Sequence, residues 1–473
     1  HTDSSAASDV YKRQLLKHFS HKPTKEQKAV LEDLSEFIST LGSRSIFLLK
    51  GYAGTGKTTL ISALVKSLPS VGKRSALLAP TGRAAKVLAK YSKRKASTLH
   101  KKIYWIRTSK NGNTFITLKE NLHTNTIFIV DEASMIPEDL NDSLSKRSLL
   151  EDLIKYVYEG IDCKLILIGD TAQLPPVHLD VSPALDEENL DKKYQKQIIS
   201  KELKEVVRQE KNSLVLENAT NLRKLIELNN NSLPKIKLNN DVIRISSGEE
   251  LQENIEAAYA QSGVENTTII CRSNKRANQY NNRIRSEILW QEDIISSGDI
   301  LMVVRNNYFW LDEKSEAGFL ANGDIIEVTR VKEIIERYGF KFAKASIRLL
   351  DYPNENEVET ILLLDTISSE SPSLKYEEYK KLYKEVGLDY KGQKDINKKI
   401  KENEFFNAIQ IKFGYSITCH KAQGGQWKEV FIDIGYFKKE MLDKNYLRWL
   451  YTAFTRSTEK LYLIGFNSDF YKN

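Results

Sequence analysis

Residues 45–68 read SIFLLKGYAGTGKTTLISALVKSL and decide the fold of this 473-residue chain. An apolar run, a Gly-rich turn and a helix-forming stretch predict a strand, a loop and a helix in that order. From Gly51 to Thr58 the loop fits the pattern G-x-x-x-x-G-K-[ST], in which backbone N–H groups can surround phosphate oxygens. The N-terminus of the following helix adds positive potential. The stretch therefore predicts an α/β domain that binds the phosphates of a nucleotide.

The polar residues of this loop have expected contacts. Lys57 should reach the β- and γ-phosphates, and the Thr58 hydroxyl should ligate Mg²⁺. A glycine turn that only caps a helix is the alternative, and the strand before the loop and the helix after it argue against that alternative. The residues of this segment expected to bind ATP are Gly51, Gly54, Thr55, Gly56, Lys57, Thr58 and Thr59.

Further short apolar runs extend the pattern in both directions from the loop. Residues 75–79, 126–130 and 164–168 each suit a buried strand, and residues 82–90 suit a helix. Short strands that alternate with helices predict a parallel sheet with crossover connections.

Polar side chains follow two of these strands directly. Asp131 and Glu132 come after residues 126–130, which would put both acids at the carboxyl edge of the sheet beside the phosphate loop. Asp131 could then hold Mg²⁺, and Glu132 could take the proton from an attacking water. Gln173, in the turn after residues 164–168, would reach the γ-phosphate. Acids that cap a helix and a loop that closes a strand are the alternatives, but the combination favours hydrolysis of ATP.

A β-hairpin is predicted between the second and third α/β units. Residues 103–107 and 114–118 alternate in character and flank an Asn-Gly pair, so the hairpin should protrude from the sheet. Its aromatic residues Tyr104, Trp105 and Phe115 could wedge a duplex apart or pack beneath the hairpin. Packing is favoured for some of them because alternating strand residues bury one face.

A second α/β block begins near residue 213, and a β-rich segment interrupts it. The segment suits a small barrel inserted into the second block. The Lys-rich residues 375–401 suit a solvated helical excursion, with a DNA-facing role as the alternative. The strands expected in the second block are 267–271, 430–434 and 461–464, a helix is expected at 273–288, and the barrel strands are expected at 299–304, 323–331, 340–350 and 358–364.

Composition and the N-terminus narrow the class of protein. A formal charge of +8 permits a polyanionic partner, and three cysteines without CxxC spacing argue against a disulfide scaffold or a structural zinc site. No apolar run is long enough for a membrane span, so a cytoplasmic protein is expected. Residues 1–14 lack the apolar segment of a signal peptide. Residues 1–19 are expected to be a non-native or disordered tail.

Eight short segments together carry a family resemblance that spans nearly the whole chain after Ser20. They resemble the motifs of superfamily 1 helicases, and within these the 5′-to-3′ group (superfamily 1B) that includes RecD-type and Dda-type enzymes. The segments are 23–27 (PTKEQ), 77–85 (LLAPTGRAA), 97–100 (STLH), 131–135 (DEASM), 169–176 (GDTAQLPP), 206–209 (VVRQ), 418–426 (TCHKAQGGQ) and 451–456 (YTAFTR).

The resemblance implies roles for further residues. Gln27 would read the adenine edge, and Arg208 and Arg456 would join Lys57, Asp131, Glu132 and Gln173 as catalytic residues by pointing guanidinium groups at the γ-phosphate. His100 and His420 could instead be ordinary hydrogen-bonded histidines. The candidate DNA contacts are Thr81, His100, Tyr104, Trp105, Arg272, Asn274, Thr418 and His420.

The resemblance also implies an architecture. Two RecA-like P-loop domains would form the motor, one from residues 20–210 and one from residues 211–297 and 411–473. A hairpin near residues 101–124 would be a separation pin, and residues 298–410 would form an SH3-like insert.

The expected function is an ATP-dependent DNA helicase that translocates 5′-to-3′ on single-stranded DNA and opens duplex junctions. The chain is expected to be a monomer with ATP and Mg²⁺ as cofactors, and replication, recombination or repair proteins are candidate partners. Three alternatives stay open: a RecD-type motor subunit of a helicase–nuclease complex, a non-translocating ATP-switched DNA clamp, and an RNA helicase.

Overall fold

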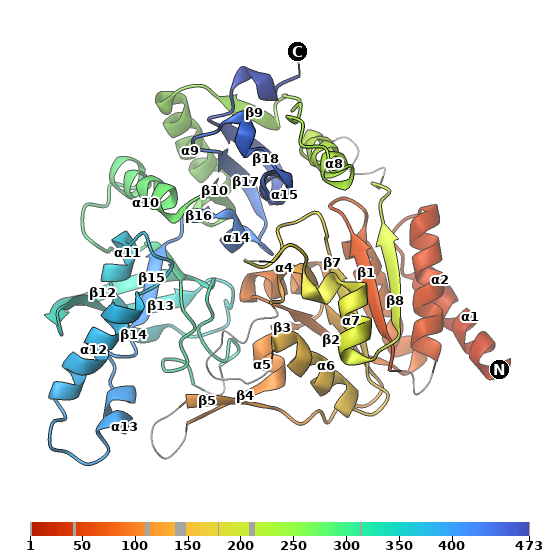
Figure 1. Ribbon diagram of the computed structural model, residues 1–473, viewed down its shortest axis with the longest axis horizontal. Helices are drawn as coiled ribbons and strands as arrows, with labels where there is room; N and C mark the ends of the chain where they lie inside the picture. The colour runs from red at the N-terminus through yellow and green to blue at the C-terminus, as the bar shows by residue number, and fades with distance from the viewer. Residues whose placement is uncertain are drawn as a thin grey trace.

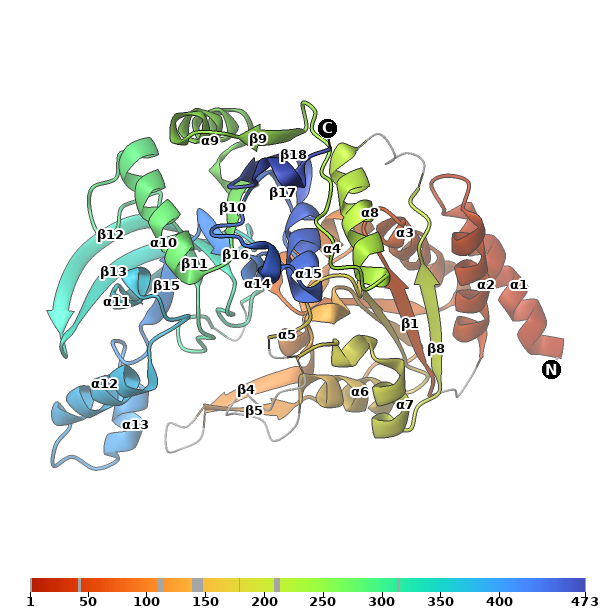
Figure 2. The ribbon, with the colours of Figure 1, turned by 45° about the horizontal axis from the view of Figure 1, so that its top comes forward.

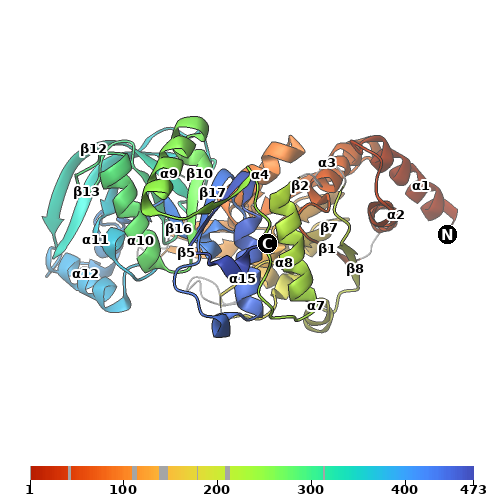
Figure 3. The same cartoon turned by 90° about the horizontal axis from the view of Figure 1, so that it is seen from above.

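Two parallel sheets and a closed barrel make up the molecule (Figure 1). The computed structural model describes residues 2–40, 44–108, 114–137, 148–177, 179–207, 213–312 and 315–472. Seen from above, a first lobe built on one sheet, a second lobe built on the other and the barrel follow one another (Figure 3). Within the described residues, no helix combines the length and the apolarity that a membrane crossing needs.

The first lobe surrounds a six-stranded sheet in the order β3-β2-β6-β7-β1-β8. Its central strands β6 and β7 are mostly apolar and fully buried because helices cover both faces. The strands are β1 (Ile46–Gly51), β2 (Arg74–Ala79), β3 (Ala96–Thr98), β6 (Thr126–Val130), β7 (Lys164–Gly169) and β8 (Ile198–Leu203), and the helices are α1 (Thr2–Lys17), α2 (Lys25–Ser39), α3 (Lys57–Ser67), α4 (Gly82–Ser92), α5 (Leu99–Ile103), α6 (Leu149–Glu159) and α7 (Glu187–Tyr194). The predicted parallel sheet is therefore confirmed.

The N-terminal segment differs from the prediction. Instead of a disordered tail, residues 2–17 form helix α1, which packs on α2 and α3. Leu15 and Phe19 are buried in the same core as α2, and Tyr11 lies against that core. Tyr11 and Leu15 are four residues apart, which places them on one side of α1, and Phe19 follows just after the helix ends. The Ser- and Ala-rich composition concealed this apolar stripe.

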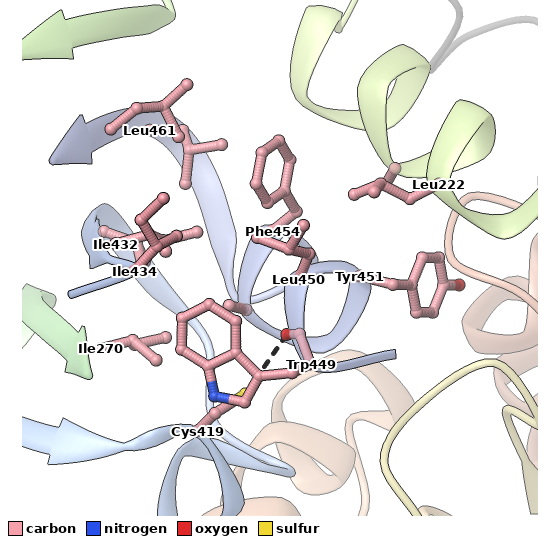
Figure 4. Packing of buried hydrophobic residues seen from close by; sticks show 14 of the residues in the cluster. Leu222, Ile270, Cys419, Ile432, Ile434, Trp449, Leu450, Tyr451, Phe454 and Leu461 are labelled. Atoms are coloured by element: carbon pink, nitrogen blue, oxygen red, sulfur yellow. Dashed lines mark hydrogen bonds between the residues drawn. The ribbon is translucent and has the colours of Figure 1, made fainter. Parts of the chain in front are cut away.

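The second lobe surrounds a five-stranded parallel sheet in the order β16-β10-β17-β18-β9. Figure 4 shows Leu450 and Phe454 of α15 packed between Ile432 of the sheet and Leu222 of α8. The strands are β9 (Val242–Ile245), β10 (Thr267–Cys271), β16 (Ser416–Thr418), β17 (Trp427–Asp433) and β18 (Ser457–Ile464), and the helices are α8 (Leu214–Glu227), α9 (Gly248–Ser262), α10 (Asn274–Arg283), α14 (Cys419–Ala422) and α15 (Lys444–Phe454).

The barrel is inserted into the second lobe between α10 and β16. Its last strand crosses the boundary predicted at residue 410. The strands are β11 (Ile300–Val303), β12 (Ile325–Arg337), β13 (Phe340–Leu349), β14 (Val358–Leu363) and β15 (Ile409–Phe413), and between β14 and β15 lie the helices α11 (Asp365–Ser368), α12 (Tyr376–Leu388) and α13 (Ile396–Lys401). The Lys-rich segment is helical as predicted, but Leu382, Val386 and Ile400 are buried against the barrel, so only part of it is solvated.

Polar contacts join the barrel to the first lobe. Lys86 of α4 donates to the carbonyl of Leu350 at 2.7 Å, and Lys101 of α5 donates to the carbonyl of Ser315 at 2.7 Å. A Cβ atom on Gly82 would lie 2.9 Å from a carboxylate oxygen of Asp324, so a larger residue there would push the barrel away. The hairpin, β4 (Tyr104–Thr108) and β5 (Thr114–Leu118), projects from the first lobe as a separate two-stranded sheet (Figure 2).

Candidate active site

The phosphate loop leaves the carboxyl end of β1 and enters α3. Gly54 and Gly56 have φ angles of +75° and +84°, which glycine adopts at little cost. A Cβ on Gly56 would also lie 2.3 Å from Nε2 of Gln27, which is fully buried behind the loop. Gln27 Nε2 donates to the carbonyl of Thr55 at 3.0 Å, and its Oε1 accepts from the backbone N–H of Thr24 at 3.0 Å.

This geometry corrects the role predicted for Gln27. Both ends of its amide hold the loop and the start of α2, and no part of the side chain is open to an adenine base. The motif singled out Gln27, but the side chain of this residue forms its hydrogen bonds with other parts of the protein. Gln27 therefore acts as a support of the phosphate loop.

Lys57 and Thr58 stand at the mouth of the loop, on the first turn of α3. The Lys57 ammonium donates to the carbonyls of Gly51 and Tyr52 at 2.5 and 2.9 Å, and the Thr58 side chain is exposed. A phosphate chain lying on the loop would meet this ammonium, the hydroxyl and the free N–H groups of the helix N-terminus. The donor set therefore fits a polyphosphate.

Two acids meet beyond the end of β6. Asp131 Oδ1 accepts from the backbone N–H of Glu132 at 2.9 Å, and the hydroxyl of Tyr91 donates to Asp131 Oδ2. Burial raises the pKa of Glu132, the charges of Arg456 and Lys57 oppose the rise, and that of Asp131 adds to it. A carboxyl with a raised pKa is suited to accept a proton.

The second lobe reaches this site through helix α15. The backbone N–H of Ala53, in the phosphate loop, donates to the Tyr451 hydroxyl at 2.9 Å, and that hydroxyl donates to Asp170 at 2.6 Å. Tyr451 belongs to the buried cluster of its own lobe, and in Figure 4 its ring points away from Ile432 of the sheet. Thr452 Oγ1 accepts from the backbone N–H of Leu174 at 2.9 Å. The two lobes are thus joined by hydrogen bonds at the nucleotide site itself.

Arg456 and Gln173 occupy buried positions in the same cleft. Arg456 is 4% exposed, and its guanidinium donates to the carbonyls of Thr452 and Gly425 at 3.0 and 3.2 Å. The side chain of Gln173 is buried, and its Oε1 has no hydrogen-bond partner among the described residues. A buried carbonyl oxygen without a donor is costly, and a water held for attack on a phosphate would supply the donor.

A cleft of about 680 Å³ lies between the two lobes and the barrel, and we call it the central cleft. Most of the predicted DNA contacts meet there although they come from distant parts of the chain. The predicted residues that line the cleft are Thr81, Arg272, Asn274, Thr418 and His420, together with Asn322 and Gly323 of the barrel.

Three other predicted DNA contacts lie elsewhere. Tyr104 is a correction: it is 6% exposed in the core of the first lobe, and its hydroxyl donates to Asp152 at 2.8 Å, so it packs under the hairpin. Trp105 is 52% exposed beneath the ammonium of Lys119. His100 contacts the rings of Tyr104 and Phe319 at the junction with the barrel. Arg208 and the side chain of Phe115 lie outside the described residues.

Tyr91, Asp170 and Tyr451 were given no role from the sequence. Tyr91 lies at the far end of a helix, and nothing in its neighbourhood along the chain points to Asp131. Asp170 follows β7 directly, in the same way that Asp131 follows β6, and this repetition was an available signal. Tyr451 opens the segment 451–456, but a tyrosine contact across two lobes has no signature in the sequence.

Comparisons with known proteins agree with this geometry. Residues 23–230 match the family described as AAA domain, and residues 413–464 match the UvrD-like helicase C-terminal domain. Uncharacterized protein R530 of Acanthamoeba polyphaga mimivirus is 26% identical over 92% of this chain and 98% of its own length.

Two characterised relatives match shorter stretches. ATP-dependent RecD2 DNA helicase of Deinococcus radiodurans is 32% identical over 33% of this chain and 19% of its own length. ATP-dependent DNA helicase dda of Enterobacteria phage T4 is 34% identical over 27% of this chain and 28% of its own length. The matches thus span less than a third of each of these two relatives. With the paired lobes and the phosphate loop, these matches make the chain similar to the superfamily 1B helicases of the RecD and Dda type.

Proposed function

We propose that this chain is an ATP-dependent DNA helicase that translocates 5′-to-3′ along single-stranded DNA and separates duplex ahead of it. One observation carries the proposal: residues of both lobes hydrogen-bond to each other at the phosphate loop, and the same two lobes line the central cleft. A change of nucleotide state would therefore move the walls of the cleft. The direction of movement is taken from the family.

The nucleotide would lie between the lobes with its phosphates on the loop. Lys57 binds the phosphate oxygens, and Thr58 and Asp131 supply the oxygen ligands that would hold Mg²⁺, which commonly binds through one or two protein oxygens together with substrate phosphates. When bound, the metal neutralises phosphate charge.

Hydrolysis requires a base, an oriented water and positive charge at the γ-phosphate. Glu132, whose pKa is raised by burial, takes the proton from the water, and the Oε1 atom of Gln173 orients that water. Arg456 presents a charged fork from the second lobe after giving up its bonds to backbone carbonyls. Removal of the γ-phosphate weakens the attraction across the cleft, so the lobes separate.

Single-stranded DNA would pass through the central cleft. Its residues offer hydroxyls, amides, two arginines and two lysines, which suit contacts to a sugar–phosphate backbone without reading base sequence. The barrel, an SH3-like module in this proposal, closes the cleft on one side. The hairpin, with Trp105 exposed on it, serves as the pin that parts the strands.

Measurement of ATP hydrolysis with and without oligo-dT tests the motor against a non-translocating clamp. The wild-type protein should be stimulated by oligo-dT, and Glu132→Gln should lose hydrolysis by about 10²-fold or more while it still binds ATP and oligo-dT. DNA binding by the wild-type protein without turnover of ATP would favour the clamp. A substitution of Glu440, an exposed acid far from the loop, serves as the matched control.

Unwinding of matched substrates tests the direction. Two partial duplexes with identical sequences carry either a 5′ or a 3′ single-stranded overhang, and only the former should be opened in the presence of ATP. Opening of the 3′-overhang substrate alone would contradict the proposed polarity. An RNA overhang of the same sequence tests the RNA alternative.

A further inference from the structure

A groove continues from the central cleft along the carboxyl edge of the second sheet. Two hollows of about 440 Å³ each adjoin there and share Arg276, Gln279, Ile464 and Gly465. The hollow that contains Tyr436 shares Arg272, Ser273 and Lys275 with the central cleft, so the three spaces form one path. We call the two hollows the edge groove, and it passes the ends of β10, β17, β18 and β9, which Figure 1 labels.

The edge groove is lined by positive charge. The basic residues are Arg244, Arg272, Lys275, Arg276 and Arg283, and the acid among the lining residues is Asp433. Asp433 is 2% exposed, and its Oδ2 accepts from Arg276 at 2.6 Å and from Tyr280 at 2.8 Å. One acid is therefore neutralised by one arginine, and the other four basic groups remain in excess over the lining acids.

The partners of those four groups leave their charge available. Arg283 and Lys275 form ion pairs with Glu287 and Glu370, but all four side chains are well exposed, and such pairs contribute little. Arg244 and Arg272 lie over the rings of Tyr471 and Tyr446 at 5.1 and 4.7 Å, and neither has a carboxylate within 4 Å among the described residues. A polyanion could therefore approach them without displacing a strong partner.

An exposed aromatic ring stands among these charges. Tyr436 follows β17, lines the groove and is 72% exposed. The ammonium of Lys438 lies 5.6 Å from its ring centre, which leaves most of the ring open to solvent. Basic groups with an exposed aromatic ring are the combination that binds single-stranded nucleic acid, through phosphate contacts and base stacking.

We infer that the edge groove carries additional nucleotides of the single strand that occupies the central cleft, with phosphates at Arg272 and Arg244 and a base stacked on Tyr436. From β10 to β9 the groove crosses three strand spacings, roughly 14 Å. At about 3.4 Å for each stacked nucleotide this length holds about four, and fewer in an extended strand. The inference rests on the proposed function and names a second segment of the DNA track.

Binding of oligo-dT of increasing length tests the inference. Fluorescence anisotropy with dT6, dT9, dT12 and dT15 should show an affinity that rises with length and then levels off. Tyr436→Ala should lower the affinity for dT15 about fivefold or more and leave that for dT6 unchanged. Arg244→Ala should reduce the slope of log affinity against log salt by about 0.7 for dT15, the value for one lost phosphate contact.

Matched variants separate a stacking role from a structural one. Tyr436→Phe keeps the ring and should bind dT15 as the wild-type protein does. Tyr376→Ala removes an equally exposed tyrosine (75% exposed) from α12, and Arg330→Ala removes an exposed arginine from the barrel; neither should shift the length dependence.

The outcomes distinguish the two proposals. If the wild-type protein binds no oligo-dT at any length, both the proposed function and the edge groove are overturned. If the wild-type protein binds and hydrolyses ATP in response to oligo-dT, but Tyr436→Ala and Arg244→Ala change dT6 and dT15 binding equally or leave both unchanged, the edge groove alone is overturned.

Discussion

The carboxyl edges of the two sheets have the same architecture and opposite charge. At the edge of the first sheet, Asp131, Glu132 and Asp170 follow neighbouring strands around a single lysine. At the edge of the second sheet, Arg272 directly follows β10 and Arg244 lies near the end of β9 instead. The comparison shows that a parallel sheet supplies positions and that the residue after each strand decides the ligand: an acid-lined edge suits a metal-bound nucleotide, and a basic edge suits a phosphodiester chain.

Removal of Arg456, the arginine of the second lobe whose charge acts on Glu132, should have the largest effect. Arg456→Ala should lower ATP turnover about 10³-fold, because no other described arginine of the second lobe acts on Glu132. Turnover by Arg456→Lys should be nearly as low, because an ammonium group cannot make the paired contacts of a guanidinium group. Turnover with saturating oligo-dT is the measurement, and the melting temperature checks that the buried site still folds. Wild-type turnover in a folded Arg456→Ala protein would remove Arg456 from the site.

The next largest loss of turnover is expected from removing the hydrogen bonds of Tyr451 that join the two lobes. Tyr451→Phe removes the acceptor for Ala53 and the donor to buried Asp170, which should lower turnover about tenfold through weaker closure. Tyr462→Phe is the matched control, because Tyr462 is also buried and donates to a buried acid, Glu429, within its own lobe. Equal losses in the two variants would show that stability alone is affected.

A smaller effect is expected at Tyr91, whose hydroxyl competes with Mg²⁺ for Asp131. Tyr91→Phe frees Asp131 Oδ2, so nucleotide binding should need about fivefold less Mg²⁺, the equivalent of one hydrogen bond. Titration of Mg²⁺ against a fluorescent ADP gives this value without any turnover. Tyr158→Phe, which removes a hydroxyl bonded to a backbone carbonyl elsewhere in the lobe, should leave the requirement unchanged.

The smallest expected effect is on stability, and it concerns Asp324, a buried acid of the barrel beside the first lobe. Burial and the nearby Asp351 raise the pKa of Asp324 to about 8. The folded protein therefore keeps a proton that the unfolded chain releases, and the stability falls as the pH rises from about 4 to about 8. Asp324→Asn should raise the free energy of unfolding by about 1 kcal/mol or more at pH 8 and by less at pH 5. Denaturant unfolding measures this, with exposed Asp293→Asn as the control, and an equal change at both pH values would contradict it.

The sequence predicted the parts of the molecule whose signals are local. The phosphate loop, the buried strands and the acids after them lie within a few residues of one another, so their geometry follows from the sheet. The same reasoning failed for Gln27 and Tyr104, because whether a side chain faces a ligand or the protein depends on residues distant in sequence. The strands Ile198–Leu203 and Val242–Ile245 went unpredicted since edge strands carry polar residues and lack a buried pattern.

The chain enters the barrel at β11 and leaves it at β15, so two backbone connections join the barrel to the second lobe. Because both ends of the barrel are continuous with the second lobe, we expect the barrel to move together with that lobe. Its contacts with the first lobe include the hydrogen bonds of Lys86 and Lys101 and the ion pair between Lys95 and Glu316. If the lobes separate during turnover as proposed, the contacts of the barrel with the first lobe would have to break and form again in each cycle.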